Sequence, residues 1–96
     1  MVYVDPLQTY SLSQYRDRQA ARVGVRTGHR WCHLVADTSN ELHAFAERLG
    51  LKRAWYRNGH YNLTPSKRAQ AVAAGAVECS PRELVKVLRR VRIFTM

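Results

Sequence analysis

The sequence is poor in the features that mark secreted and membrane proteins. It has only two cysteines, Cys32 and Cys79, too few for a disulfide framework. No apolar run approaches the ~20 residues that a membrane-spanning helix needs, and the first residues lack the charged and apolar regions of a secretory signal. We therefore expect a cytoplasmic protein that makes no use of a membrane, with its cysteines buried as small apolar groups.

Several common functional motifs are also missing. No pair of histidines or cysteines has the HxxxH or CxxC spacing of zinc sites. The five glycines are scattered singly, so no glycine-rich phosphate loop is formed. There is no internal repeat and no Gly/Ser linker. With 96 residues, 46% of them hydrophobic, the chain is expected to form one domain over residues 1–96.

Acidic residues are scarce as well, and this shortage is informative about partners. Seven Asp and Glu face 16 Lys and Arg, which gives a net charge of +9. All but three of the bases are arginine, whose planar guanidinium matches phosphate oxygens and stacks on bases. Residues 65–96 alone contain seven bases and two acids. The composition indicates an anionic partner, above all nucleic acid; a solvated basic surface would account for it equally.

Alternating hydrophobic patterns predict an α/β domain, with three helices packed on a mixed sheet of about four short strands. The expected strands are 2–4, 31–36, an extended pair 54–57 and 60–63 around an Asn58-Gly59 turn, and 77–79. By alternation, His33 shares a sheet face with Trp31 and Val35.

The three helices have clear start and stop signals. Thr38, Thr64 and Ser80 are placed as N-caps, two of them with Glu three positions later as in a capping box, and two with proline at the first helical position. Gly50 and Gly75 mark two C-terminal ends. The expected buried faces are Leu42, Phe45, Ala46 and Leu49, then Ala69, Val72, Ala73 and Ala76, and finally Leu84, Val87, Leu88 and Val91.

Residues 7–30 carry the weakest pattern. Ser11 or Ser13 is placed to cap a helix from Gln14 to Arg22, yet apolar periodicity there is poor. The other interpretation is a flexible basic insert or arm that orders on binding.

Two aspartates are the first candidates for chemistry. Asp5 and Asp37 each directly follow a predicted strand, and ligands of open α/β sheets bind beyond the carboxyl ends of strands. If the two strands are parallel neighbours, the carboxylates lie side by side and could hold Mg²⁺ or Mn²⁺. An Asp-Pro turn and support of a helix start are the simpler roles.

Basic residues are the candidates for phosphate contact. Arg16 and Arg57 neighbour aromatic residues that could stack on bases. The last predicted helix supplies most of the others, and these are Arg82, Lys86, Arg89, Arg90 and Arg92.

A family resemblance rests on several short strings. They are Tyr3-Val-Asp-Pro6, His33-Leu-Val-Ala-Asp37, Glu41-Leu-His43-Ala-Phe-Ala46, Leu49-Gly50, His60-Tyr61, Ala73-Ala-Gly-Ala-Val77 and Arg82-Glu-Leu-Val85. In combination, over residues 2–6 and about 31–88, they resemble the domain of unknown function 4031 family of small bacterial and phage proteins. Residues 7–28 lie outside the resemblance.

The resemblance implies one compact domain and no particular reaction. It nominates a polar cluster of Asp5, His33, Asp37, His43, His60 and Tyr61. The family pattern reads His-Tyr-Asp where this chain has Asn62, which weakens any role of that acid as a ligand or base.

Three functions remain open from the sequence. The first is nucleic-acid binding without catalysis. The second is a metal-dependent phosphodiesterase or nuclease that uses Asp5, His33, Asp37 and His60, whereas the same residues could form a buried polar network. The third, which follows from the phage members of the family, is a modulator that captures a host protein or a signalling nucleotide.

Overall fold

The computed structural model describes residues 1–9 and 28–95, without the side chains beyond Val91. The elements in these parts of the chain are, in order, β1 (Val2–Val4), β2 (Gln8–Thr9), β3 (Arg30–Ala36), α2 (Ser39–Arg48), the 3-10 helix η2 (Arg53–Trp55), β4 (Tyr61–Leu63), α3 (Pro65–Ala73), β5 (Val77–Glu78) and α4 (Pro81–Thr95). The predicted helix over residues 14–22, Arg16 and most of the predicted basic arm lie outside the described residues.

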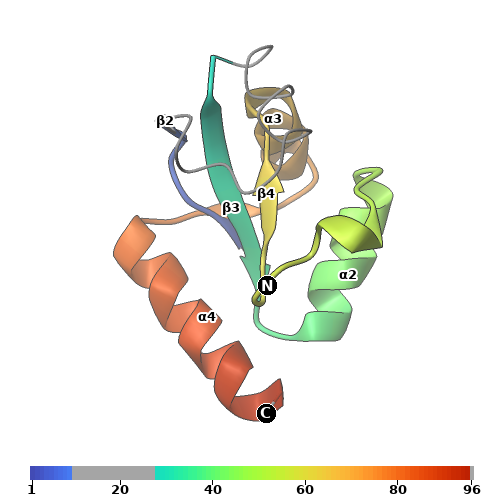
Figure 1. Cartoon of the computed structure of the whole chain (residues 1–96), viewed down its shortest axis with the longest axis vertical. Helices are drawn as coiled ribbons and strands as arrows, with labels where there is room; N and C mark the ends of the chain where they lie inside the picture. Colours follow the sequence, from blue (N-terminus) through green and yellow to red (C-terminus); the bar gives the residue numbers. More distant parts are fainter. Residues whose placement is uncertain (10–27, 96) are drawn as a thin grey trace.

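The sheet is mixed, as predicted, and is built around β3 (Figure 1). Leu34 in β3 pairs with Val4 of β1 and with Tyr61 of β4, both antiparallel. β2 pairs antiparallel with the start of β3, and β5 runs parallel to β1. The sheet has 5 strands because β2, which the sequence pattern does not reveal, joins it.

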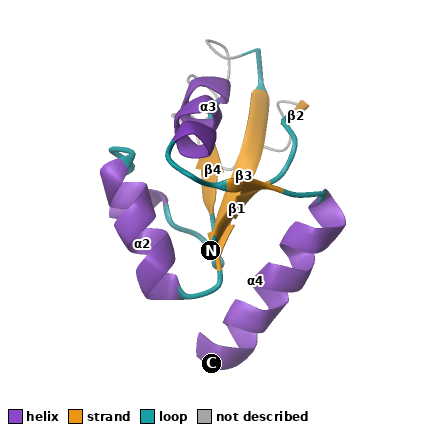
Figure 2. Cartoon of the chain, turned by 180° about the vertical axis from the view of Figure 1, so that it is seen from behind, coloured by secondary structure: helices purple, strands orange, loops and turns teal. Residues whose placement is uncertain are grey.

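The two faces of β3 bury different residues, as strand alternation requires. Cys32, Leu34 and Ala36 join the larger hydrophobic cluster, with side chains from α2 and α3. Val35 faces the other way and packs on Leu84, Val87 and Val91 of α4. Figures 1 and 2 show α2 and α4 on opposite sides of the central strands.

The predicted N-caps are confirmed at all three helices. Thr38 Oγ accepts from the Glu41 amide at 3.2 Å, Thr64 Oγ accepts from the Lys67 amide at 3.2 Å, and Ser80 Oγ accepts from the Glu83 amide at 3.1 Å. The capping box at Thr38 is incomplete, because the Glu41 carboxylate lies 2.7 Å from the amino group of Met1 instead.

The predicted strand over residues 54–57 is wrong. Residues 53–55 form η2, which buries no side chain. Within this turn the Trp55 amide donates to the Lys52 carbonyl, and the Tyr56 amide donates to the Arg53 carbonyl. The Asn58-Gly59 turn is nevertheless present, with φ of 50° at Asn58 and 88° at Gly59. The residues on either side of it, Arg57 and His60, form an isolated antiparallel β-bridge.

The predicted buried face of α3 is also partly wrong. Ala71 is its fully buried residue, while Ala69 and Ala73 are exposed. Alanines occur on several sides of this helix, so their spacing does not define a single apolar stripe. Ala76 is buried as predicted, after the helix, where its amide donates to the Ala71 carbonyl.

The buried face predicted for α4 is confirmed, because Leu84, Val87 and Val91 are buried and Leu88 is half-buried. In the part of the chain that the structure describes, no helix combines the length and the apolar character that spanning a bilayer demands.

Candidate functional site

Asp5 is the centre of the first candidate site. Within residues 1–9 and 28–91, it is the one charged side chain that is buried, with 2% exposure. Its Oδ1 accepts from the His33 amide at 2.7 Å, and its Oδ2 lies 2.8 Å from His33 Nδ1. The carboxylate therefore fixes both the backbone and the ring of a residue 28 positions away. This contact joins the end of β1 to the middle of β3.

The polar surroundings hold Asp5 in place. Arg68 Nε donates to the Asp5 carbonyl at 2.9 Å, and the Arg68 guanidinium pairs with Glu78 at 3.0 Å. Cys32 lies beside them, fully buried. Burial and the negative charge of Asp5 raise the pKa of the Cys32 thiol to about 12, so this cysteine is a neutral packing residue rather than a nucleophile.

Two further polar residues lie next to His33. The His60 ring meets it edge to face, with centroids 5.1 Å apart. Asn62 is the cross-strand partner of His33 on β4. When an ionised Asp5 accepts the Nδ1 proton of His33, Nε2 carries the lone pair, as in a carboxylate–histidine general base. The structure thus brings together three of the four proposed catalytic residues.

Asp37, the fourth, lies elsewhere, and the predicted Asp5–Asp37 metal site is wrong. The prediction required parallel neighbouring strands, but β1 and β3 are antiparallel, so Asp37 lies near the start of β1 and Asp5 after its end. Asp37 instead contacts the Met1 amino group at 2.9 Å and the Tyr3 hydroxyl at 3.3 Å. Among the described residues, no three His, Cys, Asp or Glu side chains are grouped so that they could hold a metal ion.

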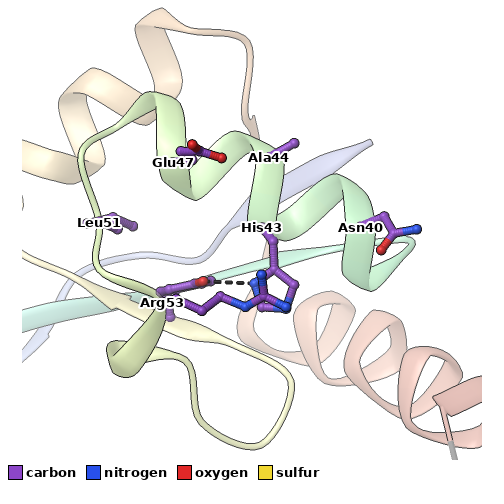
Figure 3. Close-up of a pocket in the computed structure, with 7 residues that line it drawn as sticks. Asn40, His43, Ala44, Glu47, Leu51 and Arg53 are labelled. Carbon is purple, nitrogen blue, oxygen red and sulfur yellow. Dashed lines mark hydrogen bonds between the residues drawn. The ribbon is translucent and has the colours of Figure 1, made fainter.

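A second candidate site is a cavity of about 560 Å³ on the α2 side of the sheet (Figure 3). His43 Nδ1 and the Tyr61 hydroxyl are 2.8 Å apart in it. Burial raises the pKa of Tyr61, while burial and the nearby Arg53 charge lower the pKa of His43. The cavity is lined by Asn40, His43, Ala44, Glu47, Leu51, Arg53 and Tyr61.

A third candidate is the outer face of α4. Arg82, Lys86 and Arg89 follow one another at i, i+4 and i+7, opposite the buried stripe of the helix, and all three are exposed. We call these three residues the basic stripe. Arg90 is also exposed but lies toward Tyr3. Burial raises the pKa of Tyr3, and the positive charge of Arg90 offsets part of this rise. The side chain of Arg92 lies outside the described residues.

The polar cluster that the resemblance nominates divides between the first two sites. His60 and Tyr61 are neighbours on the chain at β4, and consecutive strand residues point to opposite faces. His60 accordingly meets His33, whereas Tyr61 meets His43.

Sequence reasoning missed three polar cavity residues, which are Asn40, Glu47 and Arg53. Asn40 and Glu47 flank His43 at positions i−3 and i+4 of α2, a spacing that places them on one helix face and could have indicated a shared site. Arg53 gave no signal, since its position depends on the 3-10 turn that the pattern did not predict.

The comparisons with known proteins bear on the family alone. No curated protein and no solved structure matches the chain. The sequence profile described as "Protein of unknown function (DUF4031)" matches residues 15–91. The match includes part of the segment 7–28 that the resemblance left aside, and it does not reach residues 2–6. Since it covers far more than half of the sequence, the chain belongs to the DUF4031 family of proteins of unknown function.

Proposed function

We propose that this protein binds nucleic acid through the basic stripe of α4. The carrying observation is the exposed row of Arg82, Lys86 and Arg89. None of the ion pairs formed within residues 1–9 and 28–91 involves these three side chains. Their charges are therefore not neutralised by neighbouring carboxylates, and a row of phosphates is a suitable counter-charge.

The dimensions of the stripe fit this partner. Seven residues of helix span about 10 Å, so the stripe is long enough to meet several phosphates of one nucleic-acid strand. Glu83, the acid in the first turn of α4, is held by the hydroxyl of Ser80 at 3.0 Å and does not lie on the stripe. Val85, which is 43% exposed, adds an apolar edge beside it.

The proposal places the protein in the cytoplasm, where nucleic acid is accessible. Support comes from Cys32 and Cys79, which are both free thiols, as expected in a reducing compartment.

A charge-matched pair of variants tests the interface. We expect Lys86→Gln/Arg89→Gln to weaken binding to RNA or DNA about tenfold at low salt and to lower the slope of log K against log salt by roughly 1.5. The control is Arg48→Gln/Lys52→Gln, which removes one exposed Arg at the end of α2 and one exposed Lys just after it, and so lowers the net charge by the same amount as the test variant. Fluorescence anisotropy with labelled oligonucleotides at several salt concentrations measures both quantities.

The control decides what the result means. If both double variants lose the same affinity, net charge alone drives binding and the stripe is not an interface. If the wild type binds no oligonucleotide at low salt, the function is wrong.

A second candidate function, phosphodiester cleavage, is favoured by the Asp5–His33 contact. A histidine ring held by a buried carboxylate is arranged to remove a proton. In RNA, His33 would take the proton of the 2′-hydroxyl as that oxygen attacks phosphorus. The bond from phosphorus to the 5′-oxygen would break, and the adjacent His60 would return a proton to the leaving oxygen.

Cleavage is tested with end-labelled RNA and DNA, in EDTA and in Mn²⁺. For the acid–base mechanism we expect shortening of RNA in EDTA, reduced about 100-fold or more by His33→Gln. His29→Asn is the matched control, because Asn tolerates the left-handed backbone of His29, where φ is 57°. Equal cleavage by wild type and His33→Gln would exclude His33 as the base.

A further inference from the structure

The cavity beside α2 contains His43, whose protonation and hydrogen bonding depend on its neighbours. The Tyr61 hydroxyl is buried, and its raised pKa means that it keeps its proton at neutral pH. The pKa of His43 is lowered, so its ring is neutral. We assign the Tyr61 hydroxyl as the donor to His43 Nδ1, at 2.8 Å, an assignment that places the ring hydrogen on Nε2.

Tyr56 restricts the same ring from a second side. Its ring meets that of His43 edge to face at 4.6 Å, and Tyr61 meets it at 5.8 Å. A donor of fixed tautomer and fixed orientation is thus available at the cavity, with no ordering needed when a ligand arrives.

Arg53 places a full positive charge next to this donor. Figure 3 shows its side chain extending alongside the His43 ring. None of the ion pairs within the described residues involves Arg53. A guanidinium beside an N–H donor is a suitable arrangement for the oxygens of a phosphate group.

The opposite wall has different chemistry. Glu47 projects from α2 across the cavity from Arg53, whereas Asn40 lies on the other side of His43 along the same helix (Figure 3). The Glu47 carboxylate accepts hydrogen bonds and disfavours a second anionic group on its side of the cavity. Ala44 and Leu51 add apolar surface to the lining.

We propose that this cavity binds a mononucleotide, with the phosphate at Arg53 and His43 and the base near Glu47. The pocket is half open, and its volume of about 560 Å³ is far larger than a bare phosphate requires. A base supplies exocyclic amino donors for Glu47 and a flat apolar surface for Leu51. This proposal is independent of nucleic-acid binding at α4, which lies on the other side of the sheet.

Binding should be linked to protonation of His43. The charged or titratable groups around its ring are Arg53, Tyr56 and Tyr61, with Glu47 one helical turn away on α2. In the free protein, Arg53 and burial favour the neutral ring. A bound phosphate adds negative charge and favours the imidazolium, so the pKa of His43 rises on binding and affinity increases as the pH falls.

The experiment follows the His43 ring by NMR during titration with adenosine monophosphate. We expect saturable shifts, a higher His43 pKa in the complex, and much weaker shifts with adenosine or inorganic phosphate. Arg53→Gln should weaken binding about tenfold or more, because it removes a charged phosphate contact. Tyr61→Phe should weaken it several-fold, because the His43 ring loses the hydrogen bond at 2.8 Å that orients it.

Two control variants locate the site. Arg48→Gln removes an exposed arginine of α2 outside the cavity lining and should bind as wild type does. Lys86→Gln/Arg89→Gln should also bind normally, which separates this site from the α4 stripe. No effect of adenosine monophosphate on His43, equal binding of inorganic phosphate, or equal losses in Arg48→Gln and Arg53→Gln would each overturn the proposal.

Discussion

Replacing Asp5 with alanine is expected to lower the free energy of unfolding by about 3 kcal/mol, because a buried acceptor of charge-assisted hydrogen bonds is lost. The His33 amide would lose its acceptor at 2.7 Å, and the His33 ring would lose its partner at 2.8 Å. For a domain of this size the loss corresponds to a fall in melting temperature of roughly 10–25 °C. Thermal and urea unfolding, followed by circular dichroism, measure it.

The matched control for this prediction is Glu78→Ala. Its carboxylate also forms an ion pair, with Arg68 at 3.0 Å, but the side chain is 61% exposed. Exposed pairs contribute about 0–1 kcal/mol, so Glu78→Ala should unfold nearly as wild type does. Asp5→Asn should lie between the two, since its amide oxygen still accepts from the His33 amide. If Asp5→Ala is as stable as Glu78→Ala, the Asp5 contacts do not support the fold.

This stability role affects how Asp5 variants are interpreted in any assay of function. Asp5 holds β1 against β3 and also orients the ring of the candidate base His33. Loss of activity in Asp5→Ala would therefore not separate folding from catalysis. His33→Gln is the sharper variant for cleavage, because it removes the ring and leaves the β1–β3 strand pairing in place.

Local sequence patterns correctly predicted those strands and helices that have both a clear apolar pattern and clear start and stop residues. Residues 31–36 are apolar enough to form a buried strand, and Thr38 and Gly50 limit the following helix on both sides, as the structure confirms. The segment around Trp55 was mispredicted because aromatic residues favour strands only where a sheet surface is available to bury them. Trp55 is 48% exposed and has no such surface.

The candidate sites were predicted less completely, since they depend on strand direction. That Asp5 and Asp37 follow strands is visible in the sequence, but whether those strands run parallel is decided by tertiary pairing. The contact between Asp5 and His33 likewise depends on the register of β1 against β3. The resemblance named both residues of the His43–Tyr61 pair, whereas only the fold shows that Tyr61 and His60 act on opposite faces of the sheet.

The adjacent residues Leu34 and Val35 should differ sharply in what their truncation does. Leu34 is fully buried in the larger cluster, so Leu34→Ala is expected to lower the free energy of unfolding by about 3–4 kcal/mol. Val35→Ala removes fewer buried atoms and should lower it by roughly 1–2 kcal/mol. Urea unfolding of both variants tests this order.

Val35→Ala should nevertheless have the larger effect on α4. Val35 is the buried sheet residue of the cluster that contains Leu84, Val87 and Val91 of α4. Weakening this contact favours local opening of the helix, and hydrogen exchange should show faster exchange in α4 than elsewhere. Because α4 carries the basic stripe, Val35→Ala should also weaken nucleic-acid binding, whereas folded Leu34→Ala should bind normally. The opposite pattern would mean that α4 is held by contacts other than the Val35 cluster.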